Sequence, residues 1–313
     1  MKITKITERH IQFTVPENSD YDVHMGLILG DKHNFIVDTG MGASNMAAVL
    51  NYIDSLGSAH SKPLVAINTH HDFDHVLGNY TLKDYLIVAH RLCYEALRDG
   101  FDERSQGFIQ ENRDFIDGEI IAHPPNLTFE DSLHFHEDGI VLFHSPGHTK
   151  DSISVYDSKE KVLYIGDNFG IFDGVLELWA KDLQDFEQTL NRYKQHDIDI
   201  CVLSHSDAYR GELITLLEVA LIEAQQSAAG ESKNILTSNL EHLHTTELGI
   251  ERIRKNLNLD TDDIVAWCKD RIKADESKVV QKGKNLYVST DDCTITINVR
   301  TLSIITAHKA KAK

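Results

Sequence analysis

Short apolar runs bounded by polar or turn residues dominate the first third of the chain, and each has the length of a buried β-strand. The predicted strands are Ile11–Val15, Met25–Leu29, Asn34–Val37 and Leu64–Ile67. Apolar residues at helical spacing predict a helix over Ala43–Leu56, and Gly57 follows it as an end signal.

The alternation of strands and helices continues to about residue 226. Further strands are predicted at Leu133–Phe135, Ile140–His144, Ser152–Tyr156, Val162–Ile165 and Ile200–Leu203. Helices are predicted near Leu183–Gln195 and Glu212–Gln226, whereas residues 84–122 mix helical and loop signals. Strands interleaved with helices predict a layered α/β sandwich.

A Ser- and Asn-containing segment, residues 227–244, reads as a linker or an extended connection. Beyond it Thr246 can cap one helix, and Asp260 or Thr261 can cap a second. Alternating residues then predict a half-buried strand at 293–299 with a hairpin partner at 302–307. We therefore expect a large domain over 1–228, a linker over 229–245 and a small α+β domain over 246–313.

Composition and charge narrow the class of protein. Hydrophobic residues make up 41% and charged residues 26% of the 313 residues, which is typical of soluble globular proteins. The net charge is −18, but residues 251–313 carry +4. Nucleic acid is therefore an unlikely partner of the first domain and remains open for the C-terminal domain.

No apolar stretch approaches the ~18 residues that cross a bilayer, and the first 15 residues lack the apolar core of a secretion signal. The four cysteines show no paired spacing, which fits a reducing compartment. We expect a cytoplasmic protein without a membrane partner. Its oligomeric state is not specified by the pattern.

Ionisable side chains concentrate in residues 69–75, Thr-His-His-Asp-Phe-Asp-His, directly after the predicted strand Leu64–Ile67. Imidazoles and carboxylates are ligands of divalent metals, and a cation offsets clustered negative charge. His148, Asp167 and His205 each follow a later predicted strand. Each alone has an ordinary interpretation as a surface residue, a turn residue or a helix cap. Their order and spacing together favour one metal site at a sheet edge.

These motifs resemble the metallo-β-lactamase superfamily, whose HxHxDH signature is followed by a single His, a bridging Asp and a final His. The resemblance covers roughly residues 10–225 and includes Asp38-Thr39-Gly40. It implies an αββα sandwich within the α/β class, with Asp38 as a carboxylate that helps to fix the site. The implied metal ligands are His70, Asp72 and His148 at one site, Asp74, His75 and His205 at a second, and Asp167 as a bridge.

The chain departs from the signature at Asp72, which stands where a second histidine is usual. His71 is out of register, so we expect it beside the ligands or on the surface. A carboxylate is a harder ligand, and some di-iron members of the superfamily carry one here. We expect two divalent metal ions, zinc first, with iron or manganese as alternatives because of Asp72. A weakened or vacant first site, giving a one-metal enzyme or an inactive scaffold, is the other outcome left open.

The resemblance implies a hydrolase that uses a metal-bound hydroxide on a small ester, thioester or lactone, with Asp74 orienting the hydroxide or taking up a proton. No Ser or Cys beside a base is evident, so no covalent intermediate is expected. Residues 100–130 and 168–180 would shape the pocket. Within the second range the candidates are Phe169, Phe172 and Trp179, for which core packing is the alternative.

Residues 246–313 resemble a small bacterial domain family without an assigned function, on motifs such as Trp267-Cys268 and Lys282-Gly283-Lys284-Asn285. This unit supplies the alternative hypothesis for the whole chain. In that hypothesis the protein binds nucleic acid or a partner through its C-terminal domain, and the first domain is a catalytically weak or inactive scaffold.

Overall fold

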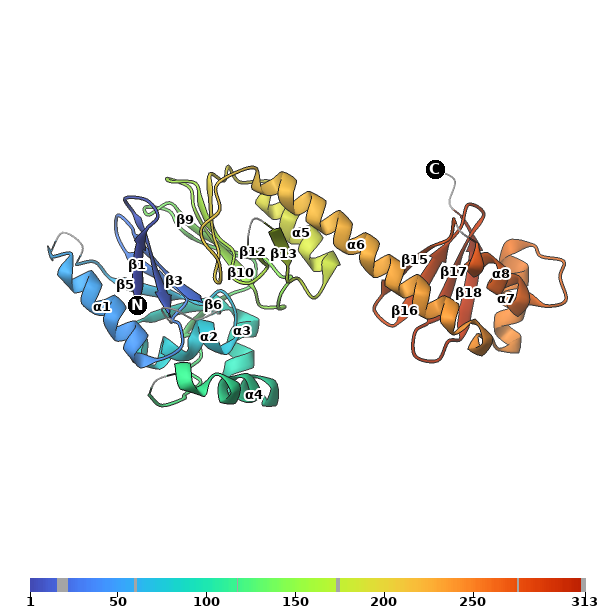
Figure 1. The fold of residues 1–313 in the computed structure, drawn as a ribbon, viewed down its shortest axis with the longest axis horizontal. Helices are drawn as coiled ribbons and strands as arrows, with labels where there is room; N and C mark the ends of the chain where they lie inside the picture. The colour runs from blue at the N-terminus through green and yellow to red at the C-terminus, as the bar shows by residue number, and fades with distance from the viewer. Residues whose placement is uncertain (16–21, 59–60, 117, 173–174, 275, 311–313) are drawn as a thin grey trace. The chain divides into compact units, whose positions relative to one another are not determined.

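The computed structural model describes residues 1–15, 22–58, 61–116, 118–172, 175–274 and 276–310 (Figure 1). The chain divides into two compact units, Met1–Leu221 and Ile222–Lys313. Each unit encloses hydrophobic cores of its own.

The first unit contains a seven-stranded sheet in the order of the sequence. Its strands are β1 (Lys2–Lys5), β2 (His10–Val15), β3 (Val23–Leu29), β4 (Asn34–Val37), β5 (Leu64–Ile67), β6 (Leu86–His90) and β7 (Leu127–Phe129). Strands β1 to β4 pair antiparallel, and β4 to β7 pair parallel. The carboxyl ends of β4 and β5 therefore meet at one edge of the sheet.

A second sheet has the order β14-β11-β10-β9-β8. Its strands are β8 (Ser132–Phe135), β9 (Ile140–His144), β10 (Ile153–Asp157), β11 (Val162–Tyr164) and β14 (Ile200–Val202). β11 pairs parallel to β14, and β10 runs antiparallel to both β9 and β11. The carboxyl ends of β9, β11 and β14 therefore share one edge.

The two sheets face each other, and helices cover their outer faces (Figure 1). Alternate strand residues, such as Val37 and Val155, fill the core between the sheets. The opposite set packs against α1 (Ala43–Ser55) on the first sheet, and against α5 (Leu183–Tyr193) and the start of α6 (Leu213–Ser238) on the second. These four layers confirm the predicted αββα sandwich.

Shorter elements complete the first unit. They are α2 (Phe73–Val76), η2 (Leu77–Leu82), α3 (Arg91–Leu97), α4 (Glu103–Glu111), η3 (Arg113–Phe115), β12 (Phe169–Phe172) and β13 (Val175–Leu178). Strands β12 and β13 form a small antiparallel pair.

The second unit combines helices with one antiparallel sheet, as expected for an α+β domain. Its elements are η4 (Leu240–His242), α7 (Glu247–Leu257), α8 (Ile264–Lys273), β15 (Lys278–Lys282), β16 (Asn285–Ser289), β17 (Cys293–Asn298) and β18 (Ile304–Lys309). The sheet order is β15-β16-β17-β18, so the predicted hairpin of the last two strands is present. Ile253, Cys268 and Ile295 lie in its core.

Two local expectations were wrong. Residues 227–238 are helical, because α6 continues to Ser238 instead of giving way to an extended connection. Ala, Glu and Lys in this stretch support a helix even where it is exposed. Asp263, not Asp260 or Thr261, caps α8, with its Oδ1 accepting the Ala266 N–H at 2.8 Å. The domain limits 1–228 and 246–313 stay a prediction.

Within the described residues, no helix has the length and apolar character required to cross a bilayer. The four cysteines are buried free thiols. The predicted cytoplasmic location stays a prediction.

Candidate metal centre

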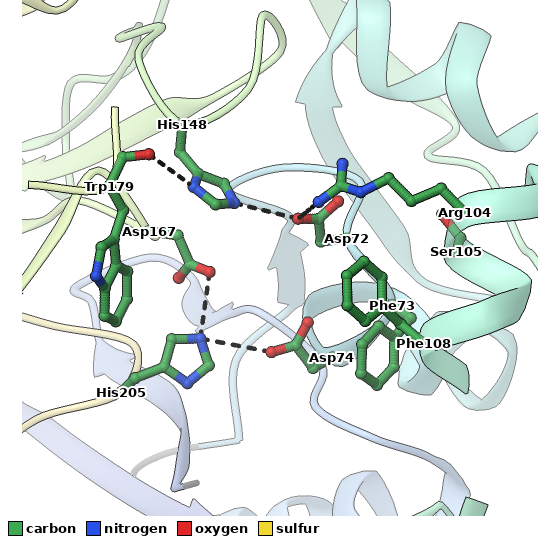
Figure 2. A pocket seen from close by; sticks show the side chains of 10 residues that line it. All are labelled: Asp72, Phe73, Asp74, Arg104, Ser105, Phe108, His148, Asp167, Trp179 and His205. Carbon is green, nitrogen blue, oxygen red and sulfur yellow. Dashed lines mark hydrogen bonds and ion pairs between the residues drawn. The ribbon is translucent and has the colours of Figure 1, made fainter. Parts of the chain in front are cut away.

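All seven candidate ligands lie where strands end, at one edge of the sandwich. His70 follows β5, Asp72 precedes the first turn of α2, and Asp74 and His75 belong to α2. The other three ligands, His148, Asp167 and His205, follow β9, β11 and β14. Figure 2 shows five of the seven, which converge from the two sheets on one cavity.

The potential ligand atoms form three groups, and within each group all the atoms lie within 4.8 Å of one another. The groups are His70, Asp72 and His148; Asp74, His75 and His205; and His70, His75 and Asp167. Each candidate ligand belongs to at least one group. The third group joins the first two, which is the position expected of a bridging carboxylate.

Distances within the groups are short enough for shared ions. Asp72 Oδ2 lies 3.2 Å from His148 Nε2 and 3.6 Å from His70 Nε2. Asp167 Oδ2 lies 3.2 Å from His205 Nε2 and 3.4 Å from His75 Nε2. The same atom is 3.7 Å from His70 Nε2.

The imidazoles are oriented by hydrogen bonds at their other nitrogen. Nδ1 of His75 lies 2.8 Å from Asp38 Oδ2, and Nδ1 of His205 lies 2.7 Å from the carbonyl oxygen of Asp22. Nδ1 of His148 lies 3.2 Å from the carbonyl oxygen of Trp179. A histidine that donates from Nδ1 presents the Nε2 lone pair to the centre, which is how metal-binding histidines are commonly held.

Three buried atoms in the centre carry no hydrogen bond to the described residues: His70 Nε2, His75 Nε2 and Asp167 Oδ1. Buried polar atoms are nearly always paired, because an unpaired one loses its hydration without compensation. Divalent cations accept imidazole nitrogen and carboxylate oxygen as ligands. The residues present therefore fit a metal ion.

Mutual charges stabilise the ionised forms of these residues. Burial lowers the pKa of His75, but the carboxylates of Asp167, Asp74 and Asp38 outweigh burial and raise the pKa well above its usual value. Burial raises the pKa of Asp72, yet the hydrogen bond from His148 and the nearby His70 imidazole bring this pKa far below its usual range. Such a concentration of unlike charges is typical of a functional site.

Asp38, which follows β4, forms hydrogen bonds with Thr69, which follows β5. Its carboxylate accepts the Thr69 N–H at 2.7 Å and the Thr69 hydroxyl at 2.8 Å, besides contacting His75. Asp38 has a φ of 61°, a left-handed conformation that is uncommon outside glycine. Gly166, with a φ of 61°, allows the second sheet to approach, since a Cβ there would lie 3.0 Å from the Thr69 side chain.

His71 lies beside the ligands. Its Nδ1 is 2.8 Å from Asp151 Oδ1, and its Nε2 is 3.8 Å from Asp72 Oδ1. The two oxygens of Asp72 thus face different partners, because Oδ2 faces His148 and His70. Asp151 is a residue that the sequence pattern did not single out.

Asn168 holds the loop that carries His148 and was also missed. Its Oδ1 accepts the His148 N–H at 3.0 Å, and its Nδ2 donates to the Ser145 carbonyl at 3.0 Å. Tyr193 of α5 supplies a hydroxyl 3.1 Å from the same Nδ2. The sequence signal was only the position of Asn168 directly after Asp167.

A cavity of about 240 Å³ opens onto the centre. The residues that line it are Asp72, Phe73, Asp74, Arg104, Ser105, Phe108, His148, Asp167, Trp179 and His205. Trp179 thus lies in the pocket as predicted, and α4 contributes from the range 100–130. Phe169 is instead fully buried in the core, and Phe172 packs on Trp179 with ring centres 5.7 Å apart.

The fold and this arrangement define a metallo-β-lactamase-type domain. A family model described as the metallo-beta-lactamase superfamily matches residues 19–205, so the chain belongs to that superfamily. A second model, described as a protein of unknown function (DUF3781), matches residues 237–308.

Curated relatives are similar over part of their length. The chain is 25% identical over 191 residues to the protein of Homo sapiens named acyl-coenzyme A thioesterase MBLAC2, covering 53% of this chain and 65% of that protein. It is 26% identical over 194 residues to the Bos taurus protein of the same name, with coverage of 53% and 65%. The matches thus span less than two thirds of these relatives.

Solved structures share the fold. The chain is similar to TMB-1 with a TM-score of 0.55 and 18% identity, covering 71% of this chain and 97% of that one. It is similar to the metallo-beta-lactamase of Pontibacter korlensis with a TM-score of 0.51 and 20% identity, covering 70% and 98%.

Proposed function

We propose that this chain is a metal-dependent hydrolase that cleaves thioesters of the acyl-coenzyme A type. The convergence of buried, unpartnered imidazole and carboxylate atoms is the observation that carries the metal dependence. Membership of the superfamily and the name of the human relative support the hydrolase and its thioester substrate.

In this proposal His70, Asp72 and His148 hold one divalent ion, Asp74, His75 and His205 hold a second, and Asp167 lies between them. When bound, such cations lower the pKa of water and stabilise negative charge that develops on a carbonyl oxygen. Zinc remains the first expectation, and iron or manganese the alternatives on account of Asp72.

The chain's own groups favour a substrate with a good leaving group. Apart from the candidate ligands, the described cavity side chains are Phe73, Arg104, Ser105, Phe108 and Trp179. None of these is a carboxyl or an imidazole, the groups that most often protonate a departing amine. A thiol has a pKa of about 8.5 and can leave as a thiolate.

In this proposal Asp74 takes up the proton of the attacking water. Its Oδ2 lies 3.4 Å from His205 Nε2 and 3.5 Å from His75 Nε2, inside the cavity. Phe73, Phe108 and Trp179 supply apolar walls that would contact the acyl group and reduce the access of bulk water. The alternative of nucleic-acid or partner binding through residues 246–313 has no supporting observation among the described residues or the comparisons.

The test combines metal analysis with thioester hydrolysis on the full-length chain. We expect at least one transition metal per chain after supplementation, and hydrolysis of a short acyl-coenzyme A that stops when a chelator removes the metal. The His148→Ala and Asp74→Ala variants should each lose metal and about 100-fold or more of kcat/KM.

His134→Ala is the matched control, because His134 is an exposed histidine stacked on His136, away from the centre. It should retain both metal and activity. Less than one metal per chain in the supplemented wild type would contradict the metal dependence, and metal binding without hydrolysis of any thioester would contradict the substrate class.

A further inference from the structure

The cavity contains a permanent cation, Arg104 of α4. Among the described residues that line the cavity, it is the one arginine or lysine. Figure 2 shows its side chain extending from α4 toward Asp72, above Phe108. Its Nη2 lies 4.0 Å from Asp72 Oδ2, and its guanidinium carbon lies 5.3 Å from the centre of the Phe108 ring.

The donors of Arg104 are available, unlike those of other arginines in the first unit. Arg9 Nη2 donates to the Asp138 carbonyl at 2.6 Å, Arg91 Nε donates to Glu130 at 2.7 Å, and Arg192 Nη2 donates to Asp131 at 2.6 Å. Within the described ranges the guanidinium of Arg104 makes no hydrogen bond, and Asp72 is too far away to accept one. Its fork of N–H groups therefore remains open to a ligand.

An arginine with free donors at a cavity is well suited to bind a carboxylate group of a ligand. The chain carries a net charge of −18, which disfavours the approach of an anion, and a guanidinium in the cavity offsets this charge locally. The planar guanidinium binds carboxylates through two parallel hydrogen bonds. Stacking on Phe108 restricts its orientation and lowers the entropy lost on binding.

We propose that Arg104 binds a carboxylate of the substrate that lies a few bonds from the scissile carbonyl, so that anionic thioesters are preferred over neutral ones of equal length. The inference rests on the proposed function, because the few-bond spacing follows from the closeness of Arg104 to Asp72. The carboxylate can belong to the acyl group or to the thiol. Both sources present the same charge to the same guanidinium.

Two matched pairs of substrates distinguish these sources on the metal-supplemented, full-length protein. The acyl pair is the glutaryl and pentanoyl thioesters of N-acetylcysteamine. The thiol pair is the pentanoyl thioester of 3-mercaptopropionate and its methyl ester. We expect kcat/KM to favour the anionic member of one pair by about tenfold or more, and this ratio to fall toward one in Arg104→Gln.

Arg104→Lys should give an intermediate ratio, since it keeps the charge but not the fork. Arg98→Gln is the control, because Arg98 lies outside the cavity and its Nε pairs with Asp99 at 3.1 Å. It should leave the ratio and the rates unchanged. An anionic-to-neutral ratio near one in both wild-type pairs, or one that Arg104→Gln leaves unaltered, would overturn the proposal.

A binding measurement separates the anion site from catalysis. By isothermal titration calorimetry the wild type should bind glutarate about tenfold more tightly than pentanoate, and Arg104→Gln should remove that difference. Equal affinity for the two acids in the wild type would overturn the anion site. Selective binding of glutarate through Arg104, in a protein that hydrolyses none of the thioesters, would uphold the anion site and refute the proposed function.

Discussion

At the scale of single residues, Asp38 decides how the candidate centre is oriented. Its carboxylate accepts two hydrogen bonds from Thr69 and lies 2.8 Å from His75 Nδ1, although its backbone is in an uncommon left-handed conformation. Local strain of about 1–3 kcal/mol persists only where surrounding contacts hold it. Asp38 therefore helps to fix the ring orientation of His75 at a conformational cost.

We predict that Asp38→Asn weakens metal binding about 10–100-fold, because an amide is a weaker acceptor for His75 Nδ1–H and its NH2 group can turn toward that nitrogen. Competition of the full-length protein with a chromophoric chelator measures the affinity. Asp138→Asn is a matched control, since Asp138 is a buried carboxylate that contacts His33 Nδ1 at 2.8 Å away from the centre. If both variants keep the wild-type metal affinity, the role of Asp38 is refuted.

At the scale of elements, the sequence predicted the strands that carry the ligands but not the helix that faces them. Leu64–Ile67 and Ile140–His144 are buried apolar runs whose period and length identify strands from local pattern alone. The helix α4 is short and polar, with only Ser105 and Ile109 buried, so its position depends on tertiary contacts that no local pattern encodes. Arg104 was not predicted as a cavity residue for that reason.

The helix caps of the second unit also show that a local sequence pattern does not predict every structural detail. Asp260, Thr261 and Asp263 are all good capping residues by type, and only the backbone conformation selects Asp263. The candidate ligands could be chosen as a set because their motifs are dense, whereas Asp151 and Asn168 contact partners distant in sequence. The local sequence pattern does not predict contacts between residues that are distant in sequence.

We predict that Asp263→Ala destabilises α8 by about 1 kcal/mol, the usual loss when a helix cap is removed. Asp260→Ala should change the stability of α8 by less than about 0.5 kcal/mol. Amide hydrogen exchange in α8 of the full-length protein should therefore accelerate about fivefold in Asp263→Ala alone. Equal acceleration in the two variants would show that the Asp263 carboxylate does not cap the helix.

At the scale of the whole first unit, two buried carboxylates connect the sheets. Asp157 of β10 accepts a hydrogen bond from His10 Nε2 of β2 at 2.9 Å, and Arg9 Nε lies 3.3 Å from the same oxygen. Asp138 follows β8 and accepts the Lys32 N–H, between β3 and β4, at 2.7 Å. In both cases burial raises the carboxyl pKa, but hydrogen bonds and nearby positive charge outweigh burial and lower it.

These shifts set the sign of the pH dependence. A carboxyl whose pKa is lower in the folded state stabilises the fold fully above its unfolded pKa of about 3.9, and this stabilisation disappears as the pH falls toward the folded pKa. We predict that Asp157→Asn lowers the free energy of unfolding by about 2 kcal/mol at pH near 7, through loss of charge-assisted hydrogen bonds. The difference from wild type should shrink between about pH 5 and pH 3, where the unfolded carboxyl takes up a proton while the native one stays ionised.

Urea unfolding of the metal-free full-length protein, followed at several pH values in that range, measures the difference between wild type and variant. Using metal-free protein removes the contribution of ligand affinity, which itself changes with pH. A deficit in Asp157→Asn that stays constant down to about pH 3 would mean that Asp157 has an ordinary pKa in the folded state. The two sheets would then be held together by the apolar core between them, without help from this charge.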